Sequence, residues 1–292
     1  MKILKPVTLT ETNIFSSNAV EDFPDWTAGS YDTGDTRVHE NSLWESLSDG
    51  NTDEPSLTST EWLRIGPSNT WAMFDDSVST QTTKSSGNLI VEIKPNRVVN
   101  SLALINLLGN KVTIEVEDDT DGVVYTREIE LDSTVILDWS MYFFEPFAQR
   151  QDLVLTDLPL YGAATISITV EAGSTAIGGL LVGTTYDIGK TQYGVNLGIR
   201  DYSIKETDDF GRLFFRERGF SKKMSPTVFI SNSQLNFISR LLSDIRATPT
   251  VFIGTQDSRF EPLIVYGYLK DWDIEIPYPE DSLLRLEVEG LT

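Results

Sequence analysis

The chain has 292 residues, enough for two domains or for one domain with additions, each with its own buried core. Its net charge of −21 disfavours nucleic acid and anionic membranes as partners, because an acidic surface is repelled by both. It has no cysteine and a single histidine, His39, which excludes disulfides, thiolate metal sites and any chemistry that needs two imidazoles.

Residues 1–20 contain short apolar pieces that suit an edge strand. Neither they nor any later run reaches the roughly 18 to 20 apolar residues of a membrane span, and they lack the apolar centre of a signal peptide. We therefore expect a soluble, unprocessed chain without membrane insertion. Residues 21–67 are dense in Gly, Asp, Ser, Thr, Asn and Pro, with short strands expected near 36–38, 43–47 and 62–65. We predict that this segment is a small aromatic module inserted before a larger domain.

The aromatic residues of the insert follow a specific order. They form the series Trp26, Tyr31-x-x-Gly34-Asp35-x-x-Val38, Trp44, Asn51, Pro55 and Trp62. This series resembles the small chitin-binding-type carbohydrate-binding modules, in which some rings form the core and one or two stack on a sugar. The resemblance makes Trp26, Tyr31, Trp44 and Trp62 candidate glycan-binding residues. The alternative is a purely structural role, and His39 departs from the family, which often has a second aromatic residue close to that position.

Residues 68–190 are predicted to form a jelly-roll-like β-sandwich, with the stretch 89–117 at its centre. The run LALINLL alone is compatible with a helix, but the β-branched runs and turn residues around it favour strands. The alternating run 111–117 leads through Asp121-Gly122 into a second alternating run, which indicates a hairpin. The preceding Trp71-x-x-Phe74-Asp75-Asp76 resembles the entry to a galactose-binding-like jelly roll.

Carboxylates beside this turn match part of a calcium-binding loop. Glu117, Asp119, Asp121 and Glu128 fall at positions 1, 3, 5 and 12 of an EF-hand-like spacing. The first position is Glu where Asp is usual, and the flanks alternate like strands, whereas the motif needs helices. A hairpin turn explains the same residues, so we predict no metal and no other cofactor.

The densest aromatic cluster follows the hairpin. It comprises Trp139, Tyr142, Phe143, Phe144 and Phe147. A cluster of this size is either buried or an interface, because soluble monomers seldom expose large apolar patches. We predict a loop folded over the mouth of the sandwich, followed by strands near 164–170 and 177–182.

Residues 191–292 are predicted to form a C-terminal β-sandwich with one flanking helix over 232–246. Ser231-x-x-Gln234 is a capping box, the apolar residues from Leu235 to Ile245 share one helix face, and Thr248-Pro249 ends the helix. A hairpin is expected at residues 208–211. A basic strip follows it, made of Arg212, Arg216, Arg218, Lys222 and Lys223. This strip is either a solvated strand face or a surface that meets acidic groups on another copy or a partner.

The order of elements in this last third, and the phrases YGYLKDWDI at 266–274 and LEVEGL at 286–291, resemble virion proteins of bacteriophage tails. The resemblance implies a structural protein that is made in the host cytoplasm and assembled in many copies in the tail. Its expected partners are other copies, other tail proteins and, through the insert, a host-surface glycan.

The sequence therefore predicts a mainly β, non-enzymatic component of a phage tail or tail tip. The first alternative is a carbohydrate-binding or adhesion protein outside a virion. The second is a glycan-active enzyme, since 44 acidic residues could supply a catalytic pair. A serine hydrolase is disfavoured because the chain has no Gly-x-Ser-x-Gly elbow and its one histidine lies in a polar stretch.

Overall fold

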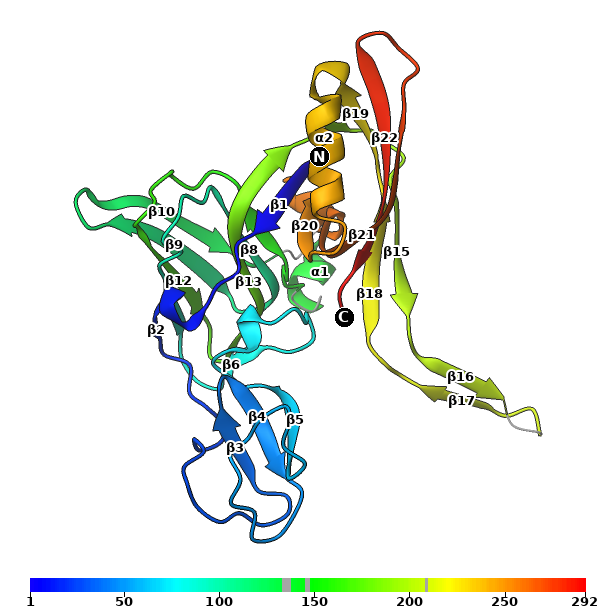
Figure 1. Ribbon diagram of the computed structural model, residues 1–292. Coiled ribbons are helices and arrows are strands. Elements are labelled where there is room, and N and C mark those ends of the chain that lie inside the picture. Colours follow the sequence, from blue (N-terminus) through cyan, green and yellow to red (C-terminus); the bar gives the residue numbers. More distant parts are fainter. Residues whose placement is uncertain (133–137, 145–147, 208–209) are drawn as a thin grey trace.

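The computed structural model describes residues 1–132, 138–144, 148–207 and 210–292, and the protein is mainly β, as the sequence predicts (Figure 1). Its largest sheet is antiparallel and has 12 strands. They are β1 (Lys2–Pro6), β6 (Thr82–Lys84), β8 (Ser101–Leu108), β11 (Leu153–Leu155), β13 (Thr175–Asp187), β14 (Lys190–Thr191), β15 (Asn196–Asp201), β18 (Phe220–Ser225), β19 (Thr227–Ser231), β20 (Thr250–Ile253), β21 (Ile264–Glu275) and β22 (Asp281–Gly290). The main path runs β11-β8-β13-β1-β20-β21-β22-β18-β15.

Strand β1 lies inside this sheet, between β13 and β20. Ile3 and Leu4 are fully buried, and Gly183 of β13 approaches so closely that an added Cβ would lie 2.1 Å from the Lys5 carbonyl oxygen. The expectation of an edge strand in this segment is therefore wrong for residues 2–6. The local sequence shows an apolar strand but carries no information on how many strands flank it.

A second, five-stranded antiparallel sheet packs on the β8 and β13 region and completes a sandwich. It has the order β10-β9-β12-β7-β2. Its strands are β2 (Ile14–Ser17), β7 (Leu89–Ile93), β9 (Lys111–Asp118), β10 (Gly122–Glu130) and β12 (Thr165–Glu171). Alternating residues of β9 and β12, such as Ile114 and Ile168, are buried against Leu104 and Leu180 of the large sheet. The run 101–108 is thus a strand, and the β9–β10 hairpin forms at the expected turn.

The C-terminal part extends the same large sheet and adds the predicted helix. Helix α2 (Leu235–Asp244) follows a 3-10 turn, η3 (Asn232–Gln234), that begins where Ser231 accepts a hydrogen bond from the Ser233 amide. Its stripe of Ile238, Leu241 and Leu242 is buried in a core that also contains Ile3 and Phe252. Because β1, β13 and β20 share one sheet, the predicted boundary at residue 190 falls within continuous β-structure.

The insert is a separate three-stranded antiparallel sheet below the sandwich (Figure 1). Its strands are β3 (Thr36–His39), β4 (Ser42–Ser46) and β5 (Trp62–Pro67). Two further strands, β16 (Ile204–Thr207) and β17 (Leu213–Arg216), form a hairpin that projects beyond β15 and β18, at the lower right of Figure 1. The remaining helical segments are η1 (Glu11–Asn13), η2 (Ala72–Phe74), α1 (Trp139–Phe144) and η4 (Ser258–Leu263). No helix among the described residues has the length and apolarity of a membrane span.

Candidate functional site: a projecting basic arm and the pocket at its root

Three of the four candidate sugar-binding rings form the core of the insert. Tyr31, Trp44 and Trp62 are at most 6% exposed, and the rings of Tyr31 and Trp62 meet edge to face with centroids 5.4 Å apart. The indole N–H of Trp62 donates to the carbonyl oxygen of Asp53 at 2.8 Å. Trp26 is partly buried against this cluster. Buried ring faces cannot stack on a sugar, so the structure gives Tyr31, Trp44 and Trp62 the structural role.

The feature that stands out from the body is the β16–β17 hairpin, which with its flanks 202–219 we call the arm (Figure 1). Its strands pair only with each other among the described residues. Pairing of Glu206 with Phe214 and of Lys205 with Phe215 puts these two aromatic residues on opposite faces. An isolated two-stranded hairpin is marginally stable in water. The arm therefore has the form of a hairpin that is stabilised by contact with another protein surface.

Both faces of the arm carry large exposed apolar side chains. Leu213, Phe214 and Phe215 are 62%, 58% and 71% exposed, and Phe220, at the start of β18, is 52% exposed. Single exposed apolar residues are ordinary, but several on one thin projection form an apolar surface of the kind found at protein interfaces.

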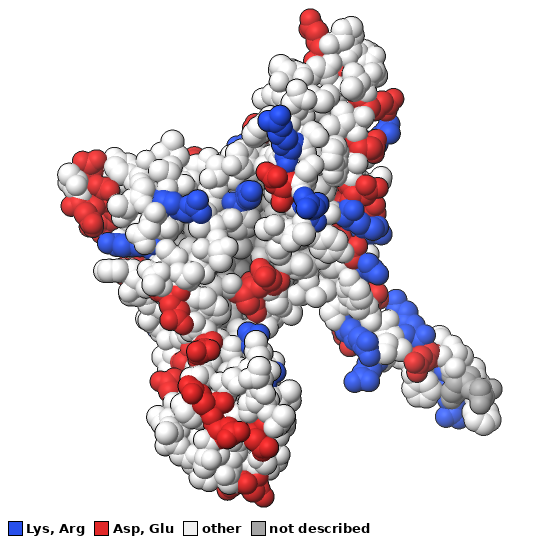
Figure 2. Space-filling view, viewed as in Figure 1, with Lys and Arg blue, Asp and Glu red and all other residues white. Residues whose placement is uncertain are grey.

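The predicted basic strip spans the arm and its root, and the structure divides it. Arg216 and Arg218 are exposed on the arm, and Figure 2 shows basic side chains gathered there. Lys222 and Lys223 lie in β18, where successive side chains point to opposite faces. Lys222 points inward and forms an ion pair with Asp152, whereas Lys223 is exposed. Only the arm portion of the strip, together with Lys223, is therefore available to a partner.

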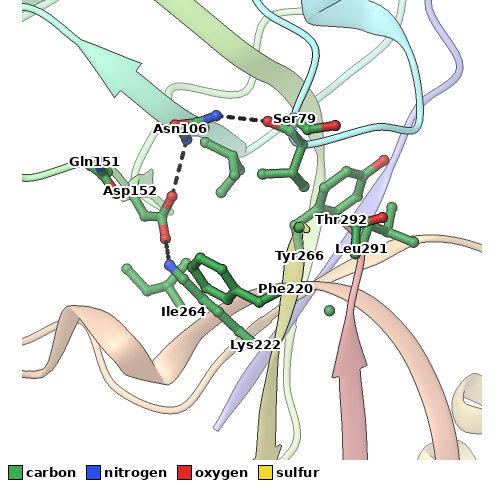
Figure 3. A pocket seen from close by; sticks show the side chains of 14 residues that line it. Ser79, Asn106, Gln151, Asp152, Phe220, Lys222, Ile264, Tyr266, Leu291 and Thr292 are labelled. Carbon is green, nitrogen blue, oxygen red and sulfur yellow. Dashed lines mark hydrogen bonds and ion pairs between the residues drawn. The ribbon is translucent and has the colours of Figure 1, made fainter. Parts of the chain in front are cut away.

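A pocket of about 330 Å³ lies at the root of the arm (Figure 3). Lys222 donates to the carboxylate of Asp152, which is 3% exposed and also accepts from the backbone N–H of Asn106 at 3.1 Å. Apolar and aromatic side chains line much of the rest of the pocket. They are Val78, Phe220, Ile264, Tyr266 and Leu291. The pocket thus has one ionic contact, buried on the Asp152 side, beside an apolar surface. Its lining residues come from both the arm root and the sandwich.

Asn106 takes a left-handed backbone conformation, with φ of 52°, in the middle of β8. The register with β13 is the same on both sides of this residue, since Leu107 pairs with Ile177 and Ile105 with Gly179. An added Cβ at the facing Gly178 would lie 2.8 Å from Cβ of Asn106, so this close approach needs glycine. The side-chain amide of Asn106 donates to the carbonyl oxygen of Val78 at 2.7 Å.

A second polar cluster fixes β15 at the base of the arm. Arg200 donates to the carboxylate of Glu289 at 2.6 Å, and Tyr202 donates to the same oxygen at 3.3 Å. Burial of the Glu289 carboxyl acts to raise its pKa, but the hydrogen bond and charge of Arg200, helped by Tyr202 and Tyr268, outweigh burial and lower the pKa. Glu289 is therefore held as a carboxylate under the arm.

The aromatic cluster after the hairpin includes helix α1, where we predicted a loop. Trp139, Phe143 and Phe144 are 79%, 67% and 82% exposed, and the Trp139 and Phe143 rings stack with centroids 6.4 Å apart. Phe147 and the side chain of Tyr142 lie outside the described residues. The exposed rings keep the interface hypothesis for this segment open as a prediction.

The carboxylates with calcium-like spacing belong to the β9–β10 hairpin. Asp118 pairs with Gly122, which has a positive φ of 73°, and Asp119 lies 3.6 Å from Lys94. No group of three or more His, Asp or Glu in the described parts of the chain is arranged to hold a metal ion. His39 lies at the edge of the insert core, 3.5 Å from Glu54 and beside the Trp26 ring.

Sequence reasoning missed the apolar half of the arm. Leu213-Phe214-Phe215 has the composition of a buried strand, and no local signal shows that a second layer is absent over it. The useful sequence signal was its position between the two acidic residues at 208–209 and a run of basic residues.

Comparison with known proteins found no match: no protein-family model, no curated protein and no solved structure matches the chain.

Proposed function

We propose that this protein is a non-enzymatic structural component of a bacteriophage tail or tail tip, which assembles in multiple copies through the arm. The proposal rests on the resemblance of the C-terminal third to tail proteins and on the mainly β fold with one flanking helix. The observation that carries the assembly function is the exposed apolar surface on both faces of the arm.

Burial of the aromatic side chains of the arm lowers the free energy relative to leaving them in water. Burying a fully exposed phenylalanine contributes about 1.5–3 kcal/mol, and Phe214 and Phe215 are 58% and 71% exposed, so covering the rest of both is worth roughly 2–4 kcal/mol before the entropic cost of association. The arm makes no sheet with the body among the described residues, and the fold leaves more than half of each of these side chains exposed. A neighbouring subunit can supply it on both faces at once.

Light scattering coupled to size exclusion, with protein from about 1 to 100 µM, tests this proposal. We expect concentration-dependent assemblies for the unmodified chain and a monomer for Phe214→Ser/Phe215→Ser. The matched control is Phe15→Ser, because Phe15 is 62% exposed on the distant strand β2. A chain that remains monomeric throughout, or an arm variant that assembles like the unmodified chain, would contradict the proposal.

A second candidate function, glycan binding, is favoured by a different surface. An open cleft of about 560 Å³ lies between the insert and the sandwich, lined by Arg64, Trp71, Phe74, Asp75 and Asp76 among others. The Trp71 and Phe74 rings are 5.3 Å apart, and Trp71 is partly exposed. An aromatic face beside carboxylates and an arginine offers the stacking surface and hydrogen-bonding groups that a sugar needs.

Glycan-array binding of Trp71→Ala tests this second candidate. We expect loss of binding relative to the unmodified chain, and unchanged binding in Trp139→Ala, which removes an exposed ring elsewhere. Equal binding by the unmodified chain and Trp71→Ala would remove the cleft as the binding site.

A further inference from the structure

Opposite charges are concentrated on the two projections of the molecule. Residues 210–223, on and beside the arm, contain five basic residues and one acidic residue. Residues 21–67, which form the insert, contain 11 acidic residues and two basic ones. Figure 2 shows the basic arm and the acidic insert as separate projections. Each projection thus presents a surface that is complementary in charge to the other.

The outer face of the insert sheet is apolar as well as acidic. The core rings Trp44 and Trp62 occupy its inner face, so Glu45 and its cross-strand partner Leu63 lie on the outer face. Leu63 is 52% exposed and Leu47, two residues beyond Glu45, is 48% exposed. Strand β5 pairs only with β4 among the described residues, so it is also an edge of this sheet.

One face of the arm has the matching pattern. Phe214 and Arg216 are two residues apart in β17 and therefore point to the same side. This face places an aromatic ring beside a cation, where the insert places an apolar side chain beside a carboxylate. Exposed sheet surfaces of this kind, with an open edge, are ready to contact another chain.

We propose that the Phe214/Arg216 face of the arm of one copy binds the Leu63/Glu45 face of the insert of a second copy. This inference rests on the proposed multi-copy function and names the surface that receives the arm. The contact joins two different patches, so each copy uses its arm on one neighbour and its insert on another. Such a head-to-tail contact closes into a ring when the rotation between copies permits, and otherwise continues as a filament.

The test uses two complementary variants of the full chain in sedimentation velocity at low salt. The arm variant is Phe214→Ser/Arg216→Glu, and the insert variant is Glu45→Lys/Leu63→Ser. Each alone should be monomeric at concentrations where the unmodified chain assembles. Mixed together they should form one-to-one heterodimers and nothing larger, because only one intact arm and one intact insert face remain in each pair.

The control is Glu115→Lys/Glu117→Lys, which reverses two exposed charges on β9 and should leave assembly unchanged. A milder variant, Glu45→Gln, guards against loss of the insert fold and should weaken self-association at least about threefold. If the insert variants assemble like the unmodified chain while the arm variant does not, this inference is wrong and the proposed function stands. If the unmodified chain never assembles, both are wrong.

Discussion

The ion pair between Lys222 and Asp152 should be a measurable part of the stability of the arm root. The side chain of Asp152 is 4% exposed, and that of Lys222 is 38% exposed. In Lys222→Met the Asp152 carboxylate still accepts the hydrogen bond from the backbone N–H of Asn106 but loses the ion pair with the lysine. Breaking a buried pair costs about 3–5 kcal/mol, and because water reaches the lysine side here we expect about 2–3 kcal/mol.

A double-mutant cycle isolates this contact. Asp152→Asn should cost about 1 kcal/mol, because Lys222 can turn into water and asparagine can still accept the Asn106 amide. The double variant Lys222→Met/Asp152→Asn should cost little more than that, which gives a coupling energy of about 2–3 kcal/mol. Urea unfolding followed by circular dichroism measures the four free energies, with the melting temperature of Lys222→Met expected to fall by about 5 °C.

The neighbouring Lys223→Met is the matched control, since Lys223 is exposed and its loss should cost less than about 0.5 kcal/mol. A Lys222→Met variant that is as stable as this control, with no coupling to Asp152→Asn, would refute the reasoning and make the ion pair energetically neutral.

Three further predictions concern other parts of the fold. The stability advantage of the unmodified chain over Arg200→Gln should be full at neutral pH and should decline in pH-dependent melts as the pH falls below the ordinary 4.5 of a glutamate, because the pKa of Glu289 is lowered in the folded state. Gly183→Ala should lower the free energy of unfolding by about 1–3 kcal/mol in urea titrations, since its methyl group meets the Lys5 carbonyl; an unchanged midpoint would contradict the close approach. Trp44→Ala should cost about 3–5 kcal/mol of insert stability, seen as early loss of amide-exchange protection in residues 21–67, and full protection there would show that Trp44 is not a core residue.

The sequence alone predicts those elements whose structure follows from the spacing of their apolar residues. The alternation in 111–117 and 164–170 predicts half-buried strands, and the spacing from Leu235 to Ile245 predicts the helix. Both follow from burial of one face, which the structure shows for Ile114, Ile168 and Ile238.

Features that depend on distant neighbours could not be predicted in this way. The rings of the insert suit a core or a sugar site equally well, and only their mutual packing at Tyr31 and Trp62 decides between them. The same holds for Lys222, whose partner Asp152 is 70 residues earlier in the chain. Strand alternation alone separates Lys222 from Lys223, but it does not say which side is buried.

The place of β1 has a consequence for how the chain is made. Residues 2–4 pair with residues 185–187 on one side and with 251–253 on the other. Until residues 251–253 have been synthesised and have left the ribosome, this strand can have only one of its two neighbours. The nascent protein therefore carries an open sheet edge until those residues emerge, and loops this long close slowly. Such an edge invites wrong pairing, so a holding chaperone or rapid completion of the chain should improve the yield of folded protein.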